Sequence, residues 1–101
     1  MSVSMVTVRR GGSREAMIAA TRKLKAVAEK NGATNFVLNQ IVVGTTHESG
    51  QWVISIGFTD WEAFGKSMQA TQNDSAANEA LAALNEVSQI VSRRTVSSVD
   101  L

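Results

Sequence analysis

The stretch TTHESGQW, residues 45–52, contains the side chains best suited to acid–base chemistry. Histidine is the residue type whose ordinary pKa lies closest to neutral pH, and His47 is the only histidine in the chain, so it is a candidate general base. Glu48 and Ser49 do not complete a catalytic triad with it, because neighbouring residues at a strand end point to different sides. The alternative is that His47 lies at a hairpin shoulder, partly solvated or in contact with a partner subunit.

Polar amides and large apolar side chains suggest where a ligand could bind. Asn39 and Gln40 interrupt an apolar segment, and a Gln40 on the core face needs a hydrogen-bond partner or a polar ligand. Asn39 is the second catalytic candidate, and both amides could also simply be satisfied by water or backbone. Trp61, Phe64 and Met68 recur on one side of a helical segment, as core residues or as a ligand wall. We expect the ligand-binding residues to be Gln40, Trp61, Phe64 and Met68.

Other chemistries are disfavoured by what the sequence lacks. The absence of cysteine excludes disulfides, thiolate metal sites and cysteine nucleophiles, and a single histidine argues against a transition-metal site. We therefore expect no metal and no cofactor. Gly11-Gly12-Ser13 before a helix could bind an anion, but without the wider glycine pattern of a dinucleotide site a turn and helix cap is simpler.

Length and composition are typical of one small soluble domain, residues 1–101, with 44% hydrophobic and 19% charged residues. The net charge of +1 gives no reason to expect nucleic acid or a membrane surface as partner. The basic excess in residues 14–30 is typical of a solvated helix face. The N-terminus resembles neither a signal nor a transit peptide, and no apolar run could span a bilayer, so a cytoplasmic location is expected.

Hydrophobic periodicity predicts the elements that must position these residues. Residues 3–10 alternate as a strand, and residues 13–31 have helical spacing from the N-cap Ser13 to the stop at Asn31-Gly32. Thr59 and Glu62 have the form of a capping box for a second helix, and Asp74 or Ser75 can cap a third helical stretch, joined to the second or continuous with it through a kink. Residues 90–99 read as an edge strand carrying two arginines.

A β-hairpin is predicted between residues 36–46 and 51–59, closed by Glu48-Ser49-Gly50. If His47 pairs with Gln51, then Thr46 lies opposite Trp52 and Gln40 opposite Phe58. One face of the hairpin is then strongly apolar and forms the core face, with Phe36, Leu38, Val42, Trp52, Ile54, Ile56 and Phe58. The other face mixes apolar and polar residues, which predicts a second covering layer, such as a partner subunit.

The element order β, α, β, β, α, β predicts the ferredoxin-like sandwich, an α+β fold with a four-stranded antiparallel sheet and helices on one face. The strand VISIGFTD, residues 53–60, running into WEAFGKSM, residues 61–68, then an alanine-rich helix and a polar final strand, resembles the dimeric α/β-barrel superfamily of antibiotic-biosynthesis monooxygenase-like proteins. The resemblance implies a homodimer whose two sheets face each other in a barrel. It also implies a ligand cleft between the helices and the sheet of each subunit.

Three functions stay open at this point. The leading expectation is a homodimer that binds a small, largely apolar molecule between helices and sheet, without evident catalytic apparatus. The alternative is a cofactor-independent monooxygenase-like enzyme acting on an aromatic or polyketide-like substrate, and a further alternative is a structural or protein-interaction module. The haem-degrading members use an asparagine on the first strand and a histidine on the later helix, and both are absent here, which argues against that activity.

Overall fold

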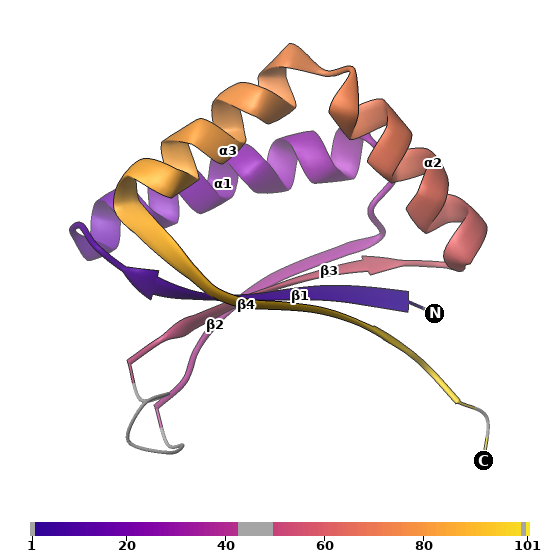
Figure 1. The fold of residues 1–101 in the computed structure, drawn as a ribbon, viewed down its shortest axis with the longest axis horizontal. Coiled ribbons are helices and arrows are strands. Elements are labelled where there is room, and N and C mark those ends of the chain that lie inside the picture. Colours follow the sequence, from indigo (N-terminus) through magenta and orange to yellow (C-terminus); the bar gives the residue numbers. More distant parts are fainter. Residues whose placement is uncertain (1, 43–49, 100) are drawn as a thin grey trace.

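The computed structural model describes residues 2–42, 50–99 and 101, and these form an antiparallel four-stranded sheet covered on one face by three helices (Figure 1). The strands lie in the order β2-β3-β1-β4, which is that of the ferredoxin-like α+β fold predicted from the sequence. In chain order the elements are β1 (Ser2–Arg10), α1 (Arg14–Lys30), β2 (Asn35–Gln40), β3 (Trp52–Phe58), α2 (Trp61–Gln72), α3 (Ser75–Val87) and β4 (Ser88–Ser97).

Helix α1 begins and ends where the sequence predicts. The Ser13 hydroxyl accepts a hydrogen bond from the Ala16 backbone N–H at 3.1 Å and so caps the first turn. At the other end Gly32 has a φ of +107°, a conformation that suits glycine. The backbone N–H groups of Gly32 and Ala33 then donate to carbonyls of the last turn, those of Glu29 and Ala28. The predicted helix 13–31 is confirmed, including both caps.

The hairpin between β2 and β3 has a different register from the one predicted. Gln40 pairs with Trp52 rather than with Phe58, and Phe36 pairs with Ile56. The backbone of Ile41 closes the pairing through hydrogen bonds with Gly50 and Gln51, both at 2.8 Å. The register is displaced by an even number of residues, so each side chain keeps its predicted face. Val42 is the exception, because it lies beyond the strand and is 79% exposed.

Aspartates cap the two helices of the second crossover. The carboxylate of Asp60 accepts the Ala63 N–H at 2.7 Å, so Asp60 and not Thr59 is the N-cap of α2. Asp74 caps α3 through the Ala76 N–H at 3.0 Å. Helices α2 and α3 are therefore separate, with a change of direction between them that is visible in Figure 1.

Asp74 also ties α3 to the end of α1. Its Oδ2 atom accepts hydrogen bonds from the side chains of Asn31 and Lys30, each at 3.2 Å, and the Lys30 contact is an ion pair. The hydrogen bond from Asn31, followed by that from Lys30, lowers the pKa of the Asp74 carboxyl below its ordinary value. One carboxylate thus joins the two helices that lie side by side over the sheet.

Strand β4 starts two residues before the predicted Ile90, at Ser88, and forms the predicted sheet edge beside β1. The pairing of the two strands shifts at Thr7 and Val8: Val8 lies opposite Ile90, and Thr7 lies opposite Ser92. Val91 is therefore an extra residue, as in a β-bulge. After it, odd-numbered residues of β4 take the face that Ile90 occupies before it.

The core lies between the helices and the sheet. The buried residues of its main cluster come from β1, α1, β3 and α3, and they are Val8, Met17, Ala20, Trp52, Ile54 and Leu84. A second cluster, Val27, Ala77 and Ala80, packs α1 against α3. The small alanine side chains allow these two helices to pack side by side. Helix α2 covers the end of the sheet beyond them (Figure 1).

The opposite face of the sheet has no covering layer among the described residues (Figure 1). By strand alternation it carries the odd-numbered residues of β1, β2 and β3 with the register-matched residues of β4, among them Val3, Met5, Val37, Val53, Arg94 and Val96. Val37 and Val96 are 37% and 43% exposed. We call this the outer face. In the described ranges of the chain, no helix has the length and apolar character needed to cross a bilayer.

Candidate functional site

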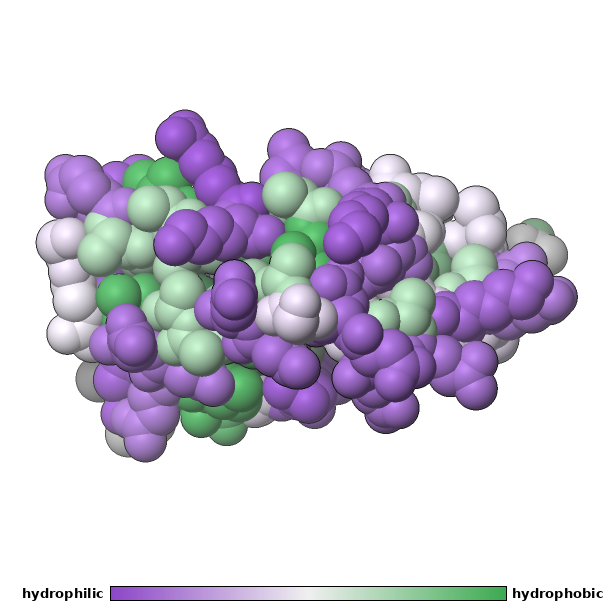
Figure 2. Space-filling model, turned by 90° about the horizontal axis from the view of Figure 1, so that it is seen from above, coloured by the Kyte–Doolittle hydropathy of each residue, from purple (hydrophilic) through white to green (hydrophobic). Residues whose placement is uncertain are grey.

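A cavity of about 240 Å³ lies between the helix layer and the sheet. Its wall is mostly apolar and is built by β1, β3, β4 and all three helices, including Leu24, Val27, Ile54, Ile56, Phe58, Phe64, Met68, Leu81 and Leu84. Small-molecule sites are typically concave and apolar with a few placed polar groups. Seen from the helix side, hydrophilic residues cover most of the layer, with apolar surface between them (Figure 2). The cavity is our candidate site.

Aromatic side chains form the end of the cavity under α2. Phe58 of β3 and Phe64 of α2 meet edge to face, with ring centroids 5.3 Å apart and planes at 89°. Trp61 packs against Phe64 in the same manner at 5.7 Å, but it is 55% exposed and does not line the cavity. The charge distribution of aromatic rings favours edge-to-face packing over direct face-to-face stacking. The Phe58–Phe64 pair therefore gives the cavity a fixed aromatic wall.

Ser67 is the polar group best placed for a ligand. It lines the cavity and is only 4% exposed, and its hydroxyl makes no hydrogen bond with another residue in the described part of the chain. Buried hydroxyls in proteins normally have a partner. A ligand with a hydroxyl or carbonyl group in the cavity would provide one.

Arg93 is the only charged residue of the described cavity wall. It lies opposite Val6 in the sheet and faces the helices because the bulge at Val91 reverses the alternation of β4. No carboxylate of the described residues forms an ion pair with it. The wall also carries Ser4 and Thr95 from the sheet and Thr71 and Asn85 from the helices. An otherwise apolar cavity wall thus carries one cation and several polar groups.

The structure brings some of the predicted site residues together and not others. Phe64 and Met68 line the cavity, whereas Trp61 lies behind Phe64 and Gln40 lies outside the wall. The Oε1 atom of Gln40 accepts a hydrogen bond of 3.5 Å from Arg14, whose guanidinium also lies 5.2 Å from the Trp52 ring centroid. That contact provides the partner that the sequence requires for Gln40. The ligand-binding role of all four residues stays a prediction.

Of the two catalytic candidates, the structure describes only Asn39, which does not line the cavity. Asn39 is exposed and lies opposite Val53, on the outer face of the sheet. His47 lies outside the described residues, as does most of the stretch TTHESGQW that surrounds it. Asn39 could therefore meet a ligand only on the face where a partner subunit is expected.

Sequence reasoning missed Ser67 and Arg93 for different reasons. Ser67 is three residues after Phe64 and one before Met68, so it belongs to the predicted apolar stripe of α2 and could have been found there. The face of Arg93 depends on the bulge at Val91, which no sequence pattern reveals. Only the register of the folded sheet places its side chain on the cavity side.

Comparison with known proteins gives likenesses of structure alone: no family model and no curated protein sequence matches the chain. HapK from Hahella chejuensis superimposes with a TM-score of 0.70 and 13% sequence identity, over 98% of this chain and 93% of HapK. A mutant of SnoaB, a cofactor-independent oxygenase from Streptomyces nogalater, superimposes with a TM-score of 0.71 and 14% identity, over 99% of this chain and 95% of SnoaB. A protein from Chloroflexus aurantiacus, assigned provisionally to the antibiotic biosynthesis monooxygenases, gives 0.64 and 14%, over 99% and 95%.

These structures share the fold of the chain over nearly its whole length. The chain therefore has the ferredoxin-like fold of antibiotic-biosynthesis monooxygenase-like proteins, as its sequence resemblance implied. At such low identity the likeness concerns the fold, and function must be argued from the site.

Proposed function

We propose that the protein is a homodimer that binds a small, largely apolar molecule in the cavity between its helices and its sheet. The observation that carries this proposal is the cavity of about 240 Å³, with its aromatic end and its free Ser67 hydroxyl. An apolar ligand gains by leaving water, at roughly 25 cal/mol for each Å² of apolar surface buried. Its polar substituent would bond to Ser67 or lie beside Arg93. Phe64 and Met68 would contact its body, with Trp61 behind them.

Binding of 1-naphthol, an aromatic molecule with one hydroxyl, tests this proposal. Titration calorimetry should show saturable binding to the unaltered protein. Ser67→Leu should remove it, because the larger side chain occupies the cavity, whereas Gln69→Leu, on the exposed side of the same helix, should bind normally. Absence of binding to the unaltered protein, or equal binding to both variants, would contradict the proposal.

The homodimer part of the proposal is supported by the outer face. Apolar residues such as Val37 and Val96 are left partly exposed there, and small domains gain stability by burying such surface. A second copy presents the same mixed face, so two sheets can cover each other through an isologous contact. This is the arrangement that the resemblance to the dimeric α/β barrels implies.

A cofactor-independent oxygenase is the second candidate function. The specific observation in its favour is the likeness to SnoaB, itself described as a cofactor-independent oxygenase, together with the cationic Arg93 in the cavity wall. In such chemistry an electron-rich phenolate or enolate gives electrons to O₂. A CH₂ group becomes a carbonyl with one oxygen atom of O₂, and the other oxygen leaves with the two hydrogens as water. Arg93 would stabilise the substrate anion.

Oxygen consumption with an anthrone as substrate tests this candidate. The enzyme should consume one O₂ for each anthrone oxidised, faster than the uncatalysed reaction, and Ser67→Leu should abolish the difference. His47→Ala and Asn39→Ala then test the two catalytic candidates from the sequence. Unchanged turnover in both variants would exclude His47 and Asn39 as catalytic residues. If the unaltered protein oxidises the anthrone no faster than buffer does, the oxygenase function is wrong. That result would not affect the ligand-binding proposal, which calorimetry tests separately.

A further inference from the structure

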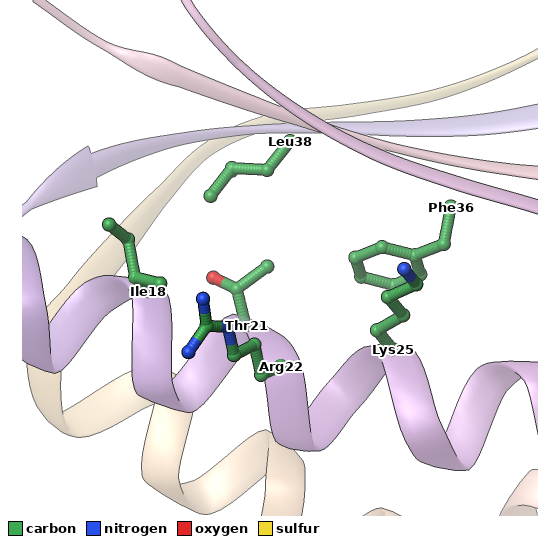
Figure 3. Close-up of a pocket in the computed structure, with 6 residues that line it drawn as sticks. All are labelled: Ile18, Thr21, Arg22, Lys25, Phe36 and Leu38. Carbon is green, nitrogen blue, oxygen red and sulfur yellow. The ribbon is translucent and has the colours of Figure 1, made fainter.

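A second hollow lies between α1 and the edge strand β2 (Figure 3). Its volume is about 210 Å³, and it shares no lining residue with the cavity of the candidate site. Helix α1 contributes one stripe of side chains at intervals of three or four residues, and β2 contributes alternate residues from the opposite side. The lining residues are Ile18, Thr21, Arg22, Lys25, Phe36 and Leu38. We call this hollow the edge groove.

The edge groove combines an apolar floor with two unpaired cations. Arg22 and Lys25 are exposed, and their side chains form no ion pair or hydrogen bond with the described residues. The Thr21 hydroxyl is buried and already donates to the Met17 carbonyl at 2.7 Å, so it offers no hydrogen to a ligand. In Figure 3 the Lys25 side chain extends from α1 toward Phe36, and the Arg22 side chain lies beside Thr21 along α1. The donors available to a ligand are therefore the two cationic groups.

We propose that the edge groove is a second ligand site that binds a small carboxylate with an apolar tail. Charge complementarity selects an anion, and the planar guanidinium of Arg22 matches a carboxylate through two parallel hydrogen bonds. Phe36, Leu38 and Ile18 provide a surface for the tail. The groove is smaller than the roughly 300–1,000 Å³ of pockets for drug-sized ligands, so a short tail fits it best. The basic excess of α1 then has a binding role rather than serving solubility alone.

Octanoate is the probe for this site, and octan-1-ol and butyrate are its controls. Octanoate should move the backbone amide NMR signals of α1 and β2 around the groove, with saturation. Octan-1-ol lacks the charge and butyrate lacks most of the tail, so each should bind about tenfold more weakly or not at all. If octan-1-ol binds the groove as tightly as octanoate, or if octanoate moves only signals of the helix–sheet cavity, the proposal is wrong.

Charge reversal gives a second and independent test. The double variant Arg22→Glu with Lys25→Glu should lose octanoate binding at the groove by about tenfold or more, because charge-assisted hydrogen bonds contribute strongly to binding. Lys23→Glu, an equally exposed position on α1 that does not line the groove, should bind normally. Both altered residues are exposed, so the fold should persist, and circular dichroism verifies it. If the double variant binds octanoate as tightly as the unaltered protein does, the proposed site is wrong. The comparison of octanoate with octan-1-ol tests the role of charge without any variant.

Discussion

At the scale of single residues, the hydroxyl of Ser67 should decide how the cavity discriminates between ligands. Ser67→Ala should weaken binding of 1-naphthol about two- to tenfold, which corresponds to one neutral hydrogen bond, and should leave 1-methylnaphthalene nearly unaffected. The two ligands have similar shape and differ in the hydroxyl. Calorimetry on both proteins measures the four affinities. An equal loss for both ligands would indicate that the substitution changes the packing of the cavity and not a hydrogen bond.

The carboxylate of Asp74 should give folding stability a dependence on pH in the acid range. The pKa of Asp74 is lowered in the folded state, so its charged form contributes to folding stability. This contribution to stability is present above the ordinary pKa of 3.8 and is lost as the pH falls through the folded-state pKa. Asp74→Asn keeps a residue that can cap α3 but removes the charge. The variant should unfold at a lower temperature than the parent protein at pH 7, and the two midpoints should converge as the pH falls below 3.8. A constant difference at all pH values would contradict this role.

Residue roles could be predicted from the sequence only where local spacing determines the environment. The caps Ser13 and Asp74 follow from residue type and position, and Phe64 and Met68 were placed on one side of a helix by their spacing. The double contact of Asp74 with Asn31 and Lys30 joins segments far apart in the chain, so no local pattern predicts it. The position of Arg93 depends in the same way on the pairing of β4 with β1.

At the scale of elements, two glycines should respond to alanine in opposite ways. Gly32 ends α1 with a φ of +107°, where an alanine is strained although nothing lies within 4 Å of its Cβ, so Gly32→Ala should destabilise the protein by about 1 kcal/mol. Gly65 lies inside α2 with the same free space and no positive φ, so Gly65→Ala should stabilise it by about 0.5–1 kcal/mol. Urea unfolding measures both. Changes of the same sign would contradict the account of the two helices.

The hairpin shows which property of an element the sequence determines. Period-two alternation gave the correct face for every residue of β2 and β3, because a displacement by an even number of residues preserves the faces. It could not give the register, since Val42 and Val43 continue the apolar pattern beyond the end of β2. The ends of the pairing are set by the backbone bonds of Ile41 with Gly50 and Gln51. The prediction was therefore right about burial and wrong about which residues lie opposite each other.

At the scale of the whole molecule, the outer face should hold two copies together. Val53→Asp places a charge on the inner strand β3 of that face. An uncompensated buried charge there should raise the dissociation constant of the dimer at least about a hundredfold. Val37→Asp, on the edge strand β2, should also raise the dissociation constant of the dimer. Because Val37 is already 37% exposed, this substitution should disturb folding of the subunit less. Gln69→Glu, in the helix layer, is the control. Sedimentation velocity at micromolar concentration measures the mass, and a monomeric parent protein or dimeric variants would contradict the homodimer.

The overall architecture was the part most accessible from the sequence. The order of strands and helices allows few topologies once crossovers are right-handed, and the chain has the predicted one. The cavity was accessible only in outline. Its location between helices and sheet followed from the resemblance, whereas its polar groups come from β1, β4, α2 and α3, and their convergence depends on the packing of four elements.

The most direct test of the central claim is an NMR titration of methyl-labelled protein with 1-naphthol. The claim is that the cavity between helices and sheet is a ligand site. It predicts that the methyl signals of Leu24, Ile54 and Leu84, which line the cavity, shift with saturation while those of Val37 and Val96 on the outer face do not. Shifts confined to the outer face, or no shifts at millimolar ligand, would contradict it.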